Sequence, residues 1–286
     1  MKPDVKAFFH QLSGTWSYVA TDTAQRQAII IDPVLDYDAA SGRTATHCAQ
    51  QILDFINDNK LSIDWILETH AHADHISAAQ WLAEKLKAKI GIGQGIQQVQ
   101  KAFKPIFNLE PEFKTDGSQF DYLFRDGEQL KIGALTLTII ATPGHTSDSL
   151  SYLIGDALFV GDSLFLPDVG TARCDFPGGD ASTLYASIKK LYQLPDTTRV
   201  FVCHDYPGAH RTAQYLTSIA EQKAKNIHIK NDTKLEEYVK LRQARDRTLS
   251  MPALILPSVQ MNIRAGQKPP PEGNGKQYLK IPLDTL

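Results

Sequence analysis

Residues 69–76 read THAHADHI and place three histidines and an aspartate within six consecutive positions. The preceding residues, IDWIL, are typical of a buried strand. Because alternate side chains of a strand face the same way, we expect His70 and His72 to lie on one face of the sheet. Asp74 and His75 then fall at the turn into a helix, where Asp74 is suited to the N-cap. Imidazole and carboxylate are the usual ligands of zinc and iron, so the stretch predicts a metal site at a sheet edge.

Three more residues of metal-ligand type follow buried strands later in the chain. LTLTIIAT (135–142) runs into a Pro-Gly turn and His145, ALFVGD ends in Asp162, and RVFVCH ends in His204. Each of these alone could have a structural role, the aspartate bonding turn amides and the histidines lying satisfied at a sheet edge. Because they repeat the position type of the first four, we expect the whole set to meet at one edge of the fold.

The order of the predicted elements indicates an α/β fold. Up to residue 93 strands alternate with helices, and the segment 36–43 is predicted to be a loop. Residues 120–162 contain closely spaced strands separated by Gly, Asp or Pro turns, which is typical of an antiparallel meander. Two sheets packed face to face, with helices on both outer faces, accommodate this order. The predicted strands are 15–20, 28–32, 63–69, 89–93, 120–124, 128–133, 135–142, 149–155, 157–162 and 199–204, and the predicted helices include 76–88, 181–191, 215–225 and 234–245.

Composition narrows the classes of function. The chain has 286 residues, of which 42% are hydrophobic and 22% charged, values that are ordinary for a globular protein. A net charge of -2 argues against a nucleic-acid partner, because phosphate binding needs clustered Lys and Arg. The three cysteines are widely spaced, so we expect no disulfide framework and a cytoplasmic location. The N-terminus lacks the apolar run of a signal peptide and no stretch is long enough to span a bilayer, so no membrane partner is expected.

The motifs THAHADH, TPGHT, GDSLF and CHDY, in that order, resemble the metallo-β-lactamase superfamily over roughly residues 10–210. The resemblance implies a four-layer αββα sandwich. It also implies a catalytic domain at 1–210, with C-terminal helices and a Pro/Gly-rich tail at 211–286 packed on the same domain. In the superfamily, the positions that match His70, His72 and His145 form one metal site, those that match Asp74, His75 and His204 form a second, and the position of Asp162 bridges both.

Other segments resemble one family within that superfamily. IDPVLDYD, GDSLFLPDVGTARCDFPGG, HDYPG and the late LPSVQMNIRAG are similar to persulfide dioxygenases, also called sulfur dioxygenases. The resemblance implies one Fe(II) per chain, held by His70, His145 and Asp162. It implies oxidation of glutathione persulfide, or a similar small persulfide, by O₂ to sulfite and thiol in sulfide detoxification. The residues that would then orient ligands and waters are His72, Asp74, His75 and His204.

The same resemblance suggests substrate contacts. Arg173 matches an arginine placed near the glutathione carboxylate, and its planar fork suits that role. The alternative for Arg173 is a structural ion pair with Asp175 or Asp168. Tyr206 matches a tyrosine that lines the thiol pocket, and its alternative is a packing role.

The resemblance is incomplete at one substrate contact and leaves a cysteine open. Where the family can supply a further arginine to glutathione, this chain has NIHIK, with His228 at the corresponding place. Either His228 or Lys230 would then replace that arginine, or the thiol carrier differs. Cys174 is either a redox-active thiol beside Arg173 or an inert buried residue.

Other functions of the superfamily remain open at this stage. The complete ligand set also fits a glyoxalase II-like hydrolase, in which two Zn or Fe ions would act on a glutathione thioester. A nuclease is disfavoured by the charge balance and by the short interval between Asp162 and His204, and a non-enzymatic binding module would need a blocked metal face. Homodimers are common in the family, so the resemblance allows a homodimer.

Overall fold

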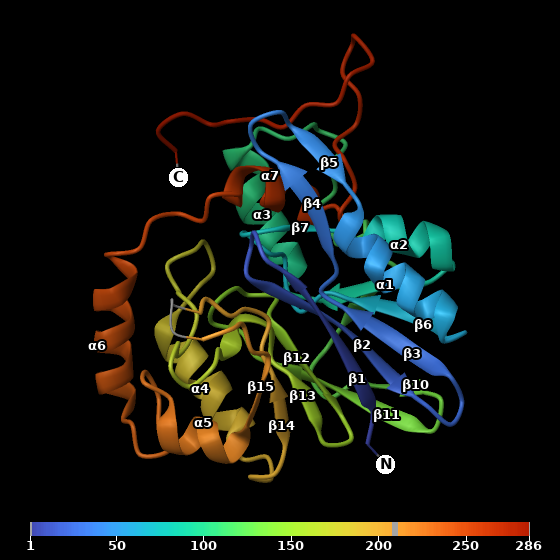
Figure 1. Cartoon of the computed structure of the whole chain (residues 1–286). Helices are drawn as coiled ribbons and strands as arrows, with labels where there is room; N and C mark the ends of the chain where they lie inside the picture. The colour runs from blue at the N-terminus through green and yellow to red at the C-terminus, as the bar shows by residue number, and fades with distance from the viewer. Residues whose placement is uncertain (1, 208–210, 286) are drawn as a thin grey trace.

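Two six-stranded sheets form the centre of the structure, a computed structural model that describes residues 2–207 and 211–285 (Figure 1). In the first sheet the order is β1-β2-β3-β6-β8-β9, with β1 to β3 antiparallel and β3, β6, β8 and β9 parallel. Its strands are β1 (Asp4–His10), β2 (Thr15–Asp22), β3 (Gln27–Ile31), β6 (Ser62–Leu67), β8 (Lys89–Gly93) and β9 (Tyr122–Phe124).

The second sheet follows chain order from β10 to β15 and is antiparallel except between β13 and β14. Its strands are β10 (Gln129–Ile132), β11 (Leu135–Ala141), β12 (Leu150–Ile154), β13 (Ala157–Phe159), β14 (Arg199–Phe201) and β15 (Leu216–Ser218). A small third sheet has the order β5-β4-β7, formed by β5 (Arg43–Ala45), β4 (Val34–Asp38) and β7 (Ile76–Ser77).

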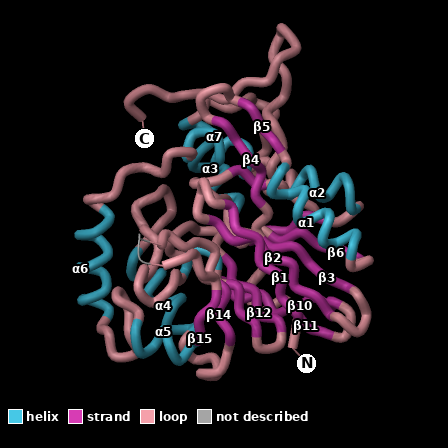
Figure 2. Tube along the Cα trace, viewed as in Figure 1, coloured by secondary structure: helices cyan, strands magenta, loops and turns pink. Residues whose placement is uncertain are grey.

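Helices lie outside the sheets, as Figure 2 shows. Those on the first sheet are α1 (His47–Asp58), α2 (Ala79–Leu86), α3 (Ile96–Ile106) and α7 (Ile255–Asn262), and those on the second are α4 (Ala181–Leu191), α5 (Ile219–Lys225) and α6 (Leu235–Asp246). Near the C-terminus, α6 packs on α4 and α7 packs on β7. Across the described part of the chain, none of the helices has the length and apolar character that crossing a bilayer requires.

The period-two pattern of the strands explains the layers. In β3, Ile29 and Ile31 pack between the two sheets, whereas Ala28 and Ile30 pack beneath the helices. In β13, Leu158 faces the opposite helical layer. Because each sheet buries both of its faces, the chain forms three apolar cores between four layers. The predicted four-layer αββα sandwich is confirmed.

One strand lies in a different sheet from the one predicted. FDYLF, expected in the antiparallel meander, forms β9 and pairs in parallel with β8 in the first sheet. There Phe124 packs on Trp65, with ring centroids 5.5 Å apart. The absence of a side chain at Gly91 makes room for that ring, because a Cβ there would overlap Phe124. The sequence of one strand does not reveal which other strand it pairs with, so the pattern of FDYLF alone could not predict its sheet.

Several boundaries also differ from the prediction. The segment 36–43 is a hairpin between β4 and β5 and not a loop. The helix expected at 76–88 begins at residue 79, after β7, and the helix expected at 215–225 begins after β15. Strand β1 and helices α3 and α7 have no counterpart in the prediction. Gly208 of the HDYPG motif and the predicted domain boundary at 210 lie outside the described residues.

Candidate metal centre

Seven side chains from both sheets meet at one end of the sandwich. The loop after β6 carries His70, and the turn after β11 carries His145. Asp162 lies in a short 3-10 turn (Gly161–Ser163) after β13, so the strand predicted to reach it ends earlier. His204 follows β14 and forms a bridge to Thr15 at the start of β2. The seven candidate ligands, His70, His72, Asp74, His75, His145, Asp162 and His204, fall into two clusters of potential ligand atoms.

The first cluster consists of His70, His145 and Asp162, whose ligand atoms lie within 4.8 Å of one another. His145 donates from Nδ1 to the carbonyl oxygen of Arg173 at 2.7 Å, which leaves its Nε2 3.6 Å from a carboxylate oxygen of Asp162. The Nδ1 of His70 is 3.1 Å from the hydroxyl of Thr69, and its buried Nε2 has no hydrogen-bond partner among the described residues. Both imidazoles are therefore oriented with Nε2 available to a cation.

The second cluster consists of His72, Asp74, His75 and His204, within the same distance limit. One hydroxyl, that of Thr15, lies 3.3 Å from the Nδ1 atoms of both His75 and His204. The buried Nε2 atoms of these two histidines lack a hydrogen-bond partner in the described part of the chain. The Nε2 of His204 is 3.4 Å from a carboxylate oxygen of Asp74, a spacing at which both atoms can bind one cation.

His72 is held by two buried carboxylates. Its Nε2 is 3.1 Å from Asp32 and 3.4 Å from Glu68. Burial opposes the charged imidazolium, but the two carboxylates outweigh it and hold the pKa of His72 well above its usual value. Burial and the neighbouring histidines instead keep the pKa of His70 well below its usual value. The first histidine of the motif is thus neutral and the second is charged in the metal-free protein.

The donor set fits a bound metal. Buried polar atoms are normally hydrogen-bonded, yet several imidazole nitrogens and one oxygen of Asp162 at this site are not. The unpartnered atoms, His70 Nε2, His72 Nδ1, His75 Nε2, His204 Nε2 and Asp162 Oδ1, belong to both clusters. A cation would satisfy them, and imidazole with carboxylate suits zinc or iron.

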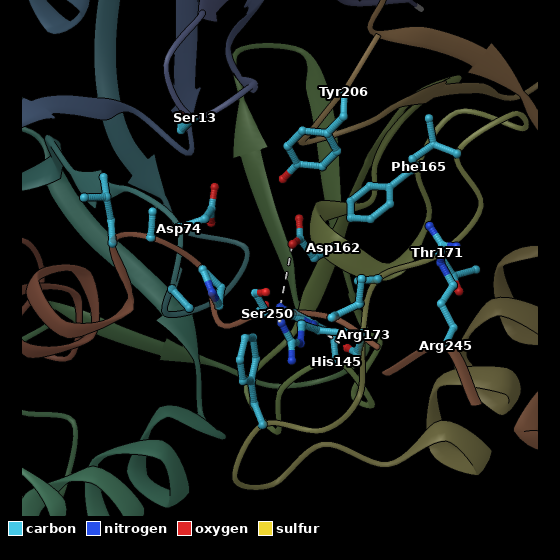
Figure 3. Close-up of a pocket in the computed structure, with 18 of the residues that line it drawn as sticks. Ser13, Asp74, His145, Asp162, Phe165, Thr171, Arg173, Tyr206, Arg245 and Ser250 are labelled. Atoms are coloured by element: carbon cyan, nitrogen blue, oxygen red, sulfur yellow. Dashed lines mark hydrogen bonds and ion pairs between the residues drawn. The ribbon is translucent and has the colours of Figure 1, made fainter. Parts of the chain in front are cut away.

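A cavity of about 440 Å³ opens onto the metal centre (Figure 3). Asp74, His145 and Asp162 lie at its base, and Phe165 and Phe176 are part of its wall. This volume is within the roughly 300–1,000 Å³ of small-molecule clefts. The wall is largely apolar, so it favours a substrate with apolar surface, which would displace water from the metal centre.

The two predicted substrate residues both line this cavity. Arg173 is already paired with Asp175, at 2.6 and 2.7 Å, donates to the carbonyl of Ser250 at 2.6 Å, and lies over the Phe176 ring. The structural ion pair considered as its alternative is therefore present. The Tyr206 side chain is 53% exposed and lies parallel to the His204 ring at 5.7 Å.

His228 and Lys230, considered as replacements for a glutathione-binding arginine, do not line the cavity. His228 is buried, and its Nδ1 accepts the backbone N–H of Thr171 at 2.9 Å. Burial and two arginines lower the pKa of His228 to about 4, so it carries no charge at neutral pH. Cys174 is buried outside the cavity and burial raises its pKa, which favours the inert interpretation.

Several supporting residues escaped the sequence analysis. Asn262 of α7 donates to the carbonyls of His72 and His75 at 2.8 and 2.7 Å and accepts the N–H of Ser77 at 2.8 Å. These bonds hold the metal loop away from the helix, which begins after Ala78, so the prediction that Asp74 is its N-cap is wrong. Only the resemblance of IDPVLDYD and LPSVQMNIRAG to family segments signalled Asp32 and Asn262. The sequence carries no such signal for Thr15 or Glu68.

Comparisons with known proteins agree with this geometry. The pattern of the metallo-beta-lactamase superfamily matches residues 11–204. A protein of Dictyostelium discoideum named glyoxylase B2 is 50% identical and spans 100% of this chain and 98% of its own. The mitochondrial persulfide dioxygenase ETHE1 of Bos taurus is 28% identical over 93% of this chain and 90% of its own. The crystal structure of ETHE1 from Myxococcus xanthus has a TM-score of 0.73 and 32% identity, covering 92% of this chain and 100% of that one. The chain is therefore an enzyme of the metallo-β-lactamase superfamily.

Proposed function

We propose that this enzyme is an iron-dependent persulfide dioxygenase that acts on glutathione persulfide or a similar small persulfide. The observation that carries the proposal is the cluster of His70, His145 and Asp162. The Asp162 carboxylate also lies 3.3 Å from the Nε2 of His204, so it links this cluster to the other. Two histidines and one carboxylate on one face of a metal are typical of non-haem Fe(II) oxygenases, because open positions remain for substrate and O₂. Two of these residues lie at the base of the cavity. The likeness to a named persulfide dioxygenase and to a solved ETHE1 structure supports the same proposal.

The proposed reaction consumes one persulfide, one O₂ and one water and yields one thiol and one sulfite. Three oxygen atoms join the outer sulfur, two from O₂ and one from water, and the bond between the two sulfurs breaks. The inner sulfur leaves as the thiol. A bound Fe(II) would supply the redox chemistry that allows O₂ to react with sulfur.

The protein's own contribution is orientation in a dry site. The carbonyl of Arg173 fixes the ring of His145, and Thr69 fixes that of His70. Phe165 and Phe176 surround the approach with apolar surface, which limits the access of bulk water to the persulfide sulfur. Positioning two reactants in this way lowers the barrier without a protein nucleophile.

A second candidate is a dinuclear hydrolase of a glutathione thioester. The intact cluster of His72, Asp74, His75 and His204 favours it, because it can hold another ion. The 50% identity to a protein named glyoxylase B2 also favours it. Two ions would supply an acidified water and polarise the thioester carbonyl.

Both activities can be measured on one anaerobically purified preparation. We expect glutathione persulfide to give one sulfite for each O₂ consumed, and a glutathione thioester to remain intact. The His47→Ala variant should behave like the wild type in both assays, because that histidine is exposed and lies outside both clusters. Thioester hydrolysis without O₂ consumption would overturn the proposal in favour of the hydrolase.

A further inference from the structure

Three arginines line the cavity: Arg173, Arg242 and Arg245. The first is committed to Asp175 and the carbonyl of Ser250, as described above. Arg242 is buried, and its guanidinium bonds Asp246 at 2.8 Å and the carbonyl of Thr171 at 2.8 Å. Freeing Arg242 for a ligand would leave the buried carboxylate of Asp246 without its partner, and freeing Arg173 would break its two bonds to Asp175.

Arg245 differs from the other two. It lies in the last turn of α6 and is exposed. Its guanidinium has neither an ion pair nor a hydrogen bond with any residue in the described ranges 2–207 and 211–285. Figure 3 shows Arg245 on one side of the cavity and Asp74 on the other, with Asp162 between them. A ligand that reaches the metal centre can therefore extend to an uncommitted cation.

The surroundings of Arg245 favour an anion. The nearby wall contains apolar side chains, among them Val169, Ala172 and Leu249. The charge of Arg242 is offset by Asp246, whereas no described acidic group offsets that of Arg245. A guanidinium can bind a carboxylate through two parallel N–H bonds, which adds geometric specificity to the charge attraction.

We propose that Arg245 binds a carboxylate of the substrate, at the end remote from the reacting sulfur. The site then takes an elongated acidic thiol of peptide type and discriminates against small neutral thiols. That the reacting group is a sulfur rests on the proposed function, but the contact between Arg245 and a carboxylate does not. Helix α6 thereby supplies the cation that His228 cannot supply.

Arg247 provides a matched control. A basic residue near the end of a helix also interacts favourably with the helix dipole, and this alone would explain Arg245. Arg247 has the same advantage as the C-cap residue of α6, is exposed, and does not line this cavity. A role in helix stability would make the two arginines equivalent, whereas ligand binding would not.

The test compares binding of glutathione with binding of its diethyl ester, in which both carboxylates are masked. Calorimetry is performed on the metal-loaded wild type and on the Arg245→Ala and Arg247→Ala variants. We expect the wild type to bind glutathione about tenfold more tightly than the ester, the size of one charge-assisted contact. Arg245→Ala should remove most of this preference, and Arg247→Ala should retain it.

Three outcomes would overturn the inference: an unchanged preference in Arg245→Ala, an equal loss in Arg247→Ala, or no glutathione binding by the wild type. Steady-state O₂ uptake separates this inference from the proposed function. If Arg245→Ala loses the preference for glutathione over its ester but the wild type consumes no O₂, only the proposed dioxygenase activity is refuted. O₂ uptake with glutathione persulfide and an unchanged KM in Arg245→Ala sinks the carboxylate contact alone.

Discussion

The two ligand clusters differ in what surrounds them. Both clusters reach the cavity, one through His145 and Asp162 and the other through Asp74. The histidines of the first cluster are fixed by neutral oxygens of Thr69 and Arg173. The other cluster includes His72, which is held by the buried carboxylates Asp32 and Glu68, and two histidines that share the Thr15 hydroxyl. Under the proposed function, the first cluster would hold the reacting ion, and the second would support it or hold an additional ion.

Removing one histidine from each cluster should separate their roles most strongly. We expect His70→Ala to lower iron affinity by more than about a hundredfold, because it removes a ligand and not a supporting residue. His75→Ala should retain iron under the same conditions. Iron per chain after dialysis measures the difference. Equal loss of iron from both variants would contradict the division into two roles.

The pH dependence of metal uptake by the metal-free protein should also differ. The depressed pKa of His70 leaves it neutral, so it has no proton to displace, whereas the raised pKa of His72 means that an ion must displace one. Raising the pH should therefore strengthen zinc binding at the second cluster by up to about tenfold per pH unit and at His70 only slightly. Calorimetry in buffers of different ionisation enthalpy counts the released protons. Release of the same number at both positions would refute this difference.

Thr15 should matter for the second cluster alone. Its hydroxyl is 2.6 Å from the hydroxyl of Ser13, which is 2.7 Å from the Nδ1 of His10, so a partly buried chain of hydrogen bonds fixes its orientation. Thr15→Val should lower metal affinity at the second cluster by about tenfold, which is at the lower end of the losses caused by removing a residue that orients a metal ligand. The iron content should be unchanged. Thr15→Ser is the matched control, and the NMR signals of the imidazole nitrogens report the tautomers. An unchanged tautomer of both His75 and His204 in Thr15→Val would rule out this role.

Arg173→Ala should have the smallest effect. Because its guanidinium is committed to Asp175, we expect KM for the persulfide to rise only a few-fold, less than about the tenfold expected of a direct charged contact. Iron content should be unchanged, because a backbone carbonyl and not the side chain holds His145. A rise larger than that caused by Arg245→Ala would mean that Arg173 is the main substrate cation.

The sequence predicted those features that repeat locally. Strands that end in ligand-type residues predicted that the candidate ligands meet at one edge, and alternating apolar residues indicated the buried sheets. The division into two sites came from the resemblance, which placed His72 with His70 and His145, whereas the structure groups it with Asp74, His75 and His204. The features that were missed depend on contacts between distant segments. Asn262 bonds the carbonyl of His72 across 190 positions, and β9 joins the first sheet because Gly91 admits Phe124. Arg245 could be singled out only once the partners of Arg173 and Arg242 were known.

The number of metal ions per chain tests the central claim most directly. Elemental analysis of protein purified without oxygen should find one iron per chain and no stoichiometric zinc, since His70, His145 and Asp162 hold the reacting ion while the other cluster supports it. Two tightly bound ions per chain would contradict the account and would assign both clusters to a dinuclear hydrolase.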